Sequence, residues 1–96
     1  MIVDRRTWNI KLGHAPEALD LLKAEFAALE AGDACPPYRI YVSRIGQFSQ
    51  IAAEYEFENL AAQEAFWADW RPQDPAFIKE WFGLNRGEIQ IEVWDL

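Results

Sequence analysis

The order of the local sequence patterns constrains the fold of this chain more than any single motif. Four segments have the composition or the two-residue alternation of strands, and two longer segments have the character of helices. The strand segments are residues 2–11, 38–43, 51–60 and 88–96, and the helical segments are 15–31 and roughly 60–70, with a short helical segment at 74–83 before the last strand. The predicted order is therefore β-α-β-β-α-β.

Capping and helix-breaking residues support this division. The first helix is the clearest element, because Pro16 suits a first helical turn and Gly32 provides a stop. Its apolar stripe comprises Leu19, Leu22, Phe26 and Leu29. Asn59 is the predicted N-cap of the second helix. In the short segment, Asp74 is the predicted cap and Gly83 the predicted end.

This order is that of the split βαβ, or ferredoxin-like, fold of the α+β class. Right-handed crossovers place both main helices on one face of a four-stranded antiparallel sheet, with the first and third strands in the middle. We call the second face, which no helix covers, the open face. All 96 residues are expected to form one domain, and a chain of this length leaves little room for a large cavity. A sizeable pocket is therefore expected to need a second chain.

Charge and cysteine content exclude several classes of partner. Nine Lys and Arg stand against 16 Asp and Glu, and this formal charge of −7 repels phosphate backbones and anionic membranes. We therefore expect no nucleic-acid partner and no membrane association. The single cysteine, Cys35, cannot form an internal disulfide, and no amino-terminal apolar run has the length of a signal peptide. A cytoplasmic location is the default expectation.

The open face carries the candidate site. In the strand at 51–60, alternation puts Glu54 and Glu56 on the face opposite to the apolar row. If water covers the open face, these two glutamates only interact with solvent. If a second chain buries the open face, each glutamate must pair with a cation or keep its proton. We take Glu54 as a candidate acid or base. The other candidate site residues, expected to bind substrate, are Arg6, Arg39, Tyr41, Glu92 and Trp94; either register of the first strand sends Arg5 or Arg6 to this face.

The opening segment, residues 2–22, resembles the start of NIPSNAP-like proteins, which read strand, Arg-Thr-aromatic, a Lys-containing turn with Gly, then helix. Arg6, Thr7, Trp8, Lys11 and Gly13 match that pattern, although Leu12 replaces the usual proline of the turn. The segments RIGQFSQI, AEYEFENLAAQEAF and DPAFIKEW are similar to that family's hairpin, aromatic-rich strand and Asp-Pro segment. The resemblance implies a homodimer, a dimeric α+β barrel in which two ferredoxin-like chains pack their sheets together. Cofactor-independent monooxygenases, isomerases and haem enzymes share that superfamily, so the resemblance implies a fold without fixing a reaction.

The remaining reactive and aromatic residues favour structural roles. His14 is expected to be a capping or exposed residue, and Cys35 has no neighbouring His or Cys to support a metal site or nucleophile. We expect no metal and no cofactor. Trp67, Trp70, Trp81 and Phe82 are expected in the core or a dimer interface, or at a cavity entrance. Three functions stay open: an enzyme for an aromatic or apolar substrate, a ligand-binding regulatory dimer, and a dimerisation unit.

Overall fold

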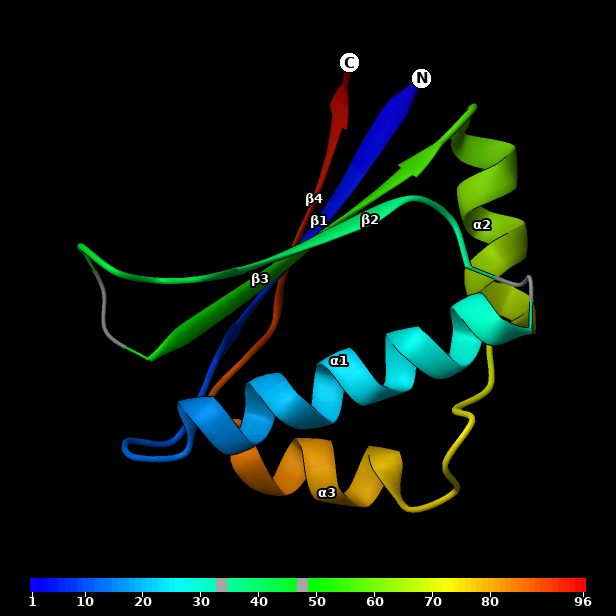
Figure 1. Ribbon diagram of the computed structural model, residues 1–96. Helices are drawn as coiled ribbons and strands as arrows, with labels where there is room; N and C mark the ends of the chain where they lie inside the picture. The colour runs from blue at the N-terminus through cyan, green and yellow to red at the C-terminus, as the bar shows by residue number, and fades with distance from the viewer. Residues whose placement is uncertain (33–34, 47–48) are drawn as a thin grey trace.

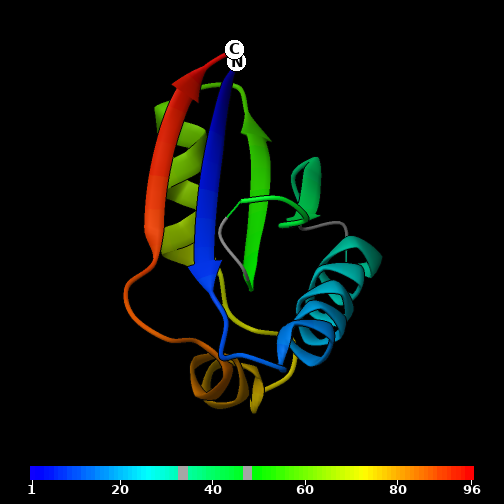
Figure 2. The ribbon, with the colours of Figure 1, turned by 90° about the vertical axis from the view of Figure 1, so that its left-hand side faces the viewer.

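The computed structural model describes residues 1–32, 35–46 and 49–96. Four strands form one antiparallel sheet in the order β2-β3-β1-β4, which confirms the α+β ferredoxin-like class and the two central strands. Their bounds are β1 Ile2–Asn9, β2 Tyr38–Val42, β3 Gln50–Phe57 and β4 Gln90–Asp95. The two termini lie together at one end of the sheet, where the backbone N–H of Leu96 donates to the carbonyl of Met1 (Figure 1, Figure 2).

Three helices lie on one side of this sheet. Their bounds are α1 Ala15–Ala31, α2 Leu60–Asp69 and α3 Phe77–Leu84. Helices α1 and α3 pack side by side, whereas α2 stands over the opposite end of the sheet (Figure 1). None of the helices in the described ranges is both long and apolar enough to cross a bilayer. The separation of α2 from α3 determines the shape of the surface on the helix side of the sheet.

The predicted helix limits are close to the observed ones, with one difference at α3. The side chain of Asn59 accepts a hydrogen bond of 2.9 Å from the N–H of Ala62, as expected of an N-cap. Asp74 instead closes a separate turn ahead of α3, accepting from the N–H of Ala76 at 2.9 Å. The predicted end at Gly83 is wrong because α3 continues to Leu84. One glycine lowers helix stability by only about 1 kcal/mol, which tertiary packing offsets.

The apolar rows of the sheet face the helices, as the alternation predicts. Ile51, Ala53, Tyr55 and Phe57 of β3 are all buried in the core. In the corresponding row, Ile89 lies just before β4 and Ile91 and Val93 lie within it. All three remain 41–50% exposed because β4 is an edge strand. The expected turn around Gly46 falls partly at residues 47–48, outside the described residues.

Candidate functional site

On the open face, one row of alternating charges crosses all four strands. The strand register places Arg39, Glu54, Arg5 and Glu92 side by side in that order. Glu54 lies 3.5 Å from the guanidinium of Arg39 and 3.9 Å from that of Arg5. Opposite charges on neighbouring strands attract each other, so the row stabilises this pairing of strands.

Glu54 also has a hydroxyl partner. The Tyr41 hydroxyl donates to Glu54 at 3.1 Å, and Arg39 makes a further ion pair with Glu56 at 3.3 Å. The side chain of Glu54 is 18% exposed, because these neighbours cover it within a single chain. Trp94 lies on the same face, beside Val3, and is 58% exposed.

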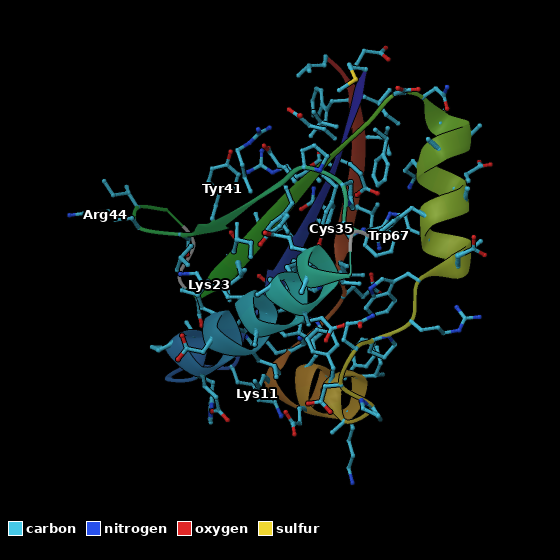
Figure 3. The ribbon with its side chains drawn as sticks, turned by 45° about the vertical axis from the view of Figure 1, so that its right-hand side comes forward. Lys11, Lys23, Cys35, Tyr41, Arg44 and Trp67 are labelled. Carbon is cyan, nitrogen blue, oxygen red and sulfur yellow. The ribbon has the colours of Figure 1, made fainter. Side chains whose placement is uncertain are left out.

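Five of the six predicted site residues thus share the open face, and Arg6 does not. In β1, Arg5 is paired with Glu54 and the next residue, Arg6, with Ala53, so Arg6 points to the helix side. The sequence left Arg5 and Arg6 as alternatives, and the structure places Arg5 on the open face. Tyr41 and Trp67 mark the two sides of the sheet in Figure 3.

The helix side holds a cavity of about 300 Å³ between the sheet and the three helices, which we call the helix-side cavity. The sequence predicts that a sizeable pocket needs a second chain, whereas the residues of one chain line this half-open cavity. Helix α3 packs against α1, while α2 lies over the other end of the sheet (Figure 1), and residues of all three helices line the cavity. The aromatic residues that line it are Trp8, Phe26, Tyr55, Trp67, Trp70, Phe77, Trp81 and Phe82.

Apart from Phe82, the rings of this lining contact one another in a continuous series. Trp67 lies 6.0 Å from Trp70, and Trp70 lies 6.4 Å from Phe77, measured between ring centroids. Phe77 stacks on Trp81 at 5.8 Å with an interplanar angle of 12°, and Trp81 meets the edge of Trp8 at 5.1 Å. Stacked and edge-to-face pairs favour defined relative orientations of the rings in the cavity walls.

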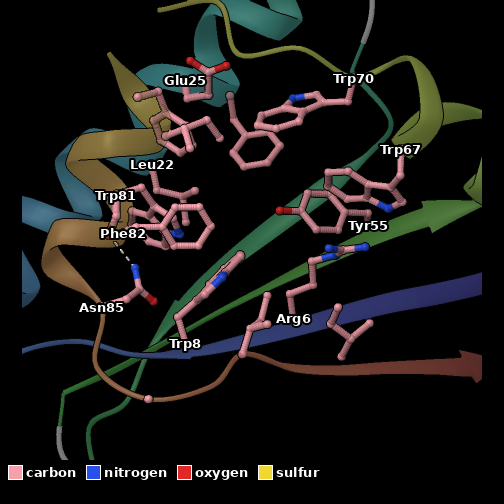
Figure 4. Close-up of a pocket in the computed structure, with 16 residues that line it drawn as sticks. Arg6, Trp8, Leu22, Glu25, Tyr55, Trp67, Trp70, Trp81, Phe82 and Asn85 are labelled. Atoms are coloured by element: carbon pink, nitrogen blue, oxygen red, sulfur yellow. Dashed lines mark hydrogen bonds between the residues drawn. The ribbon is translucent and has the colours of Figure 1, made fainter. Parts of the chain in front are cut away.

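Asp4 organises the polar end of the helix-side cavity. Its fully buried carboxylate accepts two hydrogen bonds from Arg6, at 3.2 and 3.3 Å, one from Gln63 at 3.0 Å and one from the indole N–H of Trp67 at 2.8 Å. The guanidinium of Arg6 lies 3.9 Å from the ring centroid of Trp67. This cation–π contact and the ion pair together fix Arg6 in the cavity wall (Figure 4).

Tyr55 adds a neutral hydroxyl to this end. Its ring is held between Phe26, at 5.2 Å, and Trp67, at 5.3 Å. Burial raises the pKa of Tyr55 well above that of a free tyrosine, so the hydroxyl keeps its proton. Figure 4 shows the hydroxyl directed into the space that the lining residues surround.

Glu25 fixes the segment between α2 and α3. This buried α1 side chain accepts from the backbone N–H of Gln73 at 2.6 Å and from that of Asp74 at 3.4 Å. Trp70 and Phe77, which both line the helix-side cavity, lie before and after this contact in the sequence, so Glu25 helps to position them. Among the described residues, the buried indole N–H of Trp70 has no hydrogen-bond partner.

Comparison with solved structures gives matches over nearly the whole chain. A NIPSNAP family protein from Agrobacterium tumefaciens is 23% identical, with a TM-score of 0.81, covering 98% of this chain and 90% of that one. An uncharacterised NIPSNAP domain protein from Burkholderia xenovorans is 20% identical, with a TM-score of 0.75, covering 100% and 94%. The chain has the NIPSNAP fold.

The same fold extends to an oxygenase. SnoaB, a cofactor-independent oxygenase from Streptomyces nogalater, is 9% identical to this chain, with a TM-score of 0.70, covering 99% of this chain and 91% of that one. Searches of protein-family models and of curated proteins give no match. At these identities the comparisons establish the fold and leave the reaction to the site itself.

Neither His14 nor Cys35 belongs to a group of side chains, among the described residues, that could hold a metal ion. His14 occupies the N-cap position of α1, where its Nδ1 lies 3.1 Å from Glu17. Burial, and to a lesser extent Glu30, raises the pKa of the Cys35 thiol to about 11, so it is not a reactive thiolate at neutral pH. Within the described ranges, no group of three or more His, Cys, Asp or Glu side chains could hold a metal ion.

Sequence reasoning missed the polar groups of the helix-side cavity. Asp4 and Arg6 share the inward row of β1 with Ile2 and Trp8, and two charges in an otherwise apolar row indicate a buried ion pair. Glu25 similarly lies beside the apolar stripe of α1. The sequence contains both of these signals, but the donors from α2, Gln63 and Trp67, could be assigned only from the tertiary structure.

Proposed function

We propose that the helix-side cavity binds a small planar aromatic molecule, with Arg6 and Tyr55 orienting its polar end. The observation that carries the proposal is a cavity of about 300 Å³ in which aromatic walls meet a fixed guanidinium and a phenol. Ligand sites in proteins are concave and mostly apolar, with a few placed polar groups. A close-packed interior of this size has no structural need for such a cavity, since unfilled volume lowers stability.

Cofactor-independent oxygenase or isomerase chemistry is the catalytic form of this proposal. SnoaB supports it as a protein of the same fold that is named a cofactor-independent oxygenase. Glu54 lies on the open face, so a catalytic Glu54 would require a ligand bound there instead. We expect Glu54→Gln to leave binding in the helix-side cavity unchanged. If Glu54→Gln abolishes the turnover of a ligand bound in the helix-side cavity, the assignment of the reaction to that cavity, away from Glu54, is contradicted.

The indole N–H signals in the NMR spectrum test the location of binding directly. The chain has five tryptophans, of which Trp8, Trp67, Trp70 and Trp81 line the helix-side cavity and Trp94 lies on the open face. A ligand in the cavity should shift the first four signals and leave that of Trp94 in place. A shift confined to Trp94 would instead place the ligand on the open face and overturn the proposal.

A matched pair of variants tests whether the cavity itself is needed. Ile91 and Val93 lie in the same row of β4 and are similarly exposed, at 50% and 44%, but only Ile91 lines the cavity. Ile91→Trp should block the mouth and abolish binding, whereas Val93→Trp should bind as the wild type does. Equal ligand binding by the two variants would argue against the helix-side cavity as the binding site.

The open face supports a second proposal, a cytoplasmic homodimer in which two sheets pack against each other. A row of alternating charges together with the exposed Tyr41 and Trp94, 44% and 58% exposed, provides both charge complementarity and apolar area for a second copy. In this alternative function the domain is a non-catalytic dimerisation or regulatory module. Light scattering over a concentration series should give about twice the 11.1 kDa chain mass; a monomer throughout excludes the dimer.

A further inference from the structure

We propose that the helix-side cavity selects an uncharged aromatic carbonyl compound and discriminates against the matching carboxylate. This inference rests on the proposed function and specifies the class of ligand. Arg6 alone would suggest an anion, since guanidinium groups bind carboxylates well. The groups that surround Arg6 argue for the opposite preference.

The first argument is the local charge. Among the described residues that line the cavity, Arg6 on β1 is the only cation, and Glu25 on α1 is a carboxylate in the same lining. Directly behind Arg6 lies the carboxylate of Asp4, which is fully buried and already paired with it. The three groups sum to one negative charge, and Tyr55 on β3 stays neutral because burial raises its pKa. A carboxylate ligand would add a second negative charge in a site where water screens little.

The second argument is the direction of the unused hydrogen bonds. Arg6 uses Nε and Nη2 toward Asp4, and no bond from its Nη1 to another described residue is present. Tyr55 offers a protonated hydroxyl. The Nη1 group of Arg6 and the hydroxyl of Tyr55 can each donate to a ligand oxygen. Each carboxylate is already supplied with donors, Asp4 by Arg6, Gln63 and Trp67 and Glu25 by backbone N–H groups. A carbonyl oxygen fits this set because it accepts without adding charge.

The third argument is the shape of the walls. The mostly aromatic lining, in which Phe77 and Trp81 are parallel and Trp8 lies at 88° to Trp81, provides an apolar space beside the polar end. A fused bicyclic ring can stack in such a space. A naphthalene ring with one carbonyl substituent therefore represents the ligand class.

Three naphthalene compounds of nearly equal shape form the test. They are 2-naphthamide, which is uncharged, 2-naphthoate, its anionic isostere, and naphthalene, which lacks the oxygen. Calorimetry should give a Kd for 2-naphthamide at least about tenfold below that for 2-naphthoate, with naphthalene weaker than the amide. The signals of Trp8, Trp67, Trp70 and Trp81 confirm that each compound occupies the cavity.

The outcomes separate this inference from the proposed function. If 2-naphthoate shifts the same four signals and binds as tightly as the amide, the charge selection is wrong while the cavity remains a ligand site. If none of the three compounds shifts these signals up to its solubility limit, both the inference and the proposed function are overturned.

Variants identify the source of the selection. Asp4→Asn should lower the ratio of the 2-naphthoate Kd to the 2-naphthamide Kd by about tenfold or more, because it removes the negative charge behind Arg6. If this variant does not fold, Glu25→Gln tests the same charge effect in the cavity wall and should shift the ratio in the same direction. Glu64→Gln, which removes an exposed carboxylate from α2, is the control and should leave the ratio unchanged. An unchanged ratio in both cavity variants would overturn the proposed charge selection.

Discussion

Arg5 and Arg6 are adjacent in the sequence, yet their guanidinium groups serve opposite faces of the sheet. Arg5 lies 3.9 Å from Glu54 on the open face, whereas Arg6 lies 3.2 Å from the buried carboxylate of Asp4 on the helix side. Their side chains are 45% and 17% exposed, respectively. The two ion pairs therefore differ in their dependence on solvent and in the stability lost when one partner is removed.

Replacing Asp4 by Ala is expected to lower the free energy of unfolding by about 3 kcal/mol or more, because the change leaves the buried charge of Arg6 without its partner. It also removes the acceptor of Gln63 and Trp67. Urea denaturation measures the effect. Arg5→Gln, in the neighbouring position on the exposed face, is the matched control and should change stability far less. Comparable losses in the two variants would contradict the distinction between the faces.

Glu25→Ala is expected to lower the free energy of unfolding by about 2 kcal/mol, since two backbone N–H groups lose their acceptor. The segment between α2 and α3 should also open more easily. Hydrogen exchange at the amides of Gln73 and Asp74 measures this opening. Glu25→Gln keeps one side-chain oxygen as acceptor and should retain slow exchange at Gln73. Unchanged exchange in Glu25→Ala would show that these contacts do not hold the segment.

Stability is expected to fall in alkaline solution because of two tyrosines. Interaction with the Glu30 side chain, followed by burial, raises the pKa of Tyr38 to about 12, and burial raises the pKa of Tyr55 further. The unfolded chain loses both protons above the ordinary tyrosine pKa of about 10, while the folded chain retains them. The contribution of these two tyrosines to the free energy of unfolding is therefore complete below about pH 10 and is lost as the pH rises through about 12.

Tyr55→Phe tests this alkaline effect. The urea midpoint of the variant should decrease less than that of the wild type between about pH 9 and pH 12. Both proteins should carry Cys35→Ser, because the raised pKa of the thiol acts in the same direction. A decrease of the same size in both would mean that Tyr55 ionises as easily in the folded chain as in the unfolded one.

Periodicity was sufficient to predict the fold because each element has its own pattern and most also have a capping residue. The apolar row of β3 and the N-cap Asn59 both lie where the sequence placed them. Periodicity could not decide between Arg5 and Arg6, since each row of β1 contains one arginine. The pairing of Arg5 with Glu54 and of Arg6 with Ala53 depends on the register between strands that are far apart in the sequence.

The helix-side cavity depends on information that no local pattern contains. Helical spacing led us to expect Trp67, Trp70 and Trp81 in the core, in a dimer interface or at a cavity entrance. It could not decide among these because spacing is the same for a filled core and for a cavity wall. The difference arises from how α3 packs against α1. That packing in turn relies on contacts such as Glu25 with the N–H of Gln73, which join residues separated by 48 positions.

Exchanging the charges of Arg5 and Glu54 tests the proposed dimer across the open face. Arg5→Glu alone places three glutamates side by side, at positions 54, 5 and 92, and these like charges should weaken self-association by about tenfold or more. The double variant Arg5→Glu/Glu54→Arg restores one opposite-charge pair and should recover part of the affinity. Light scattering over a concentration series measures both variants. If self-association of the wild type is unaffected by Arg5→Glu, the dimer does not use the open face, because a reversed charge at the centre of a buried row cannot be neutral.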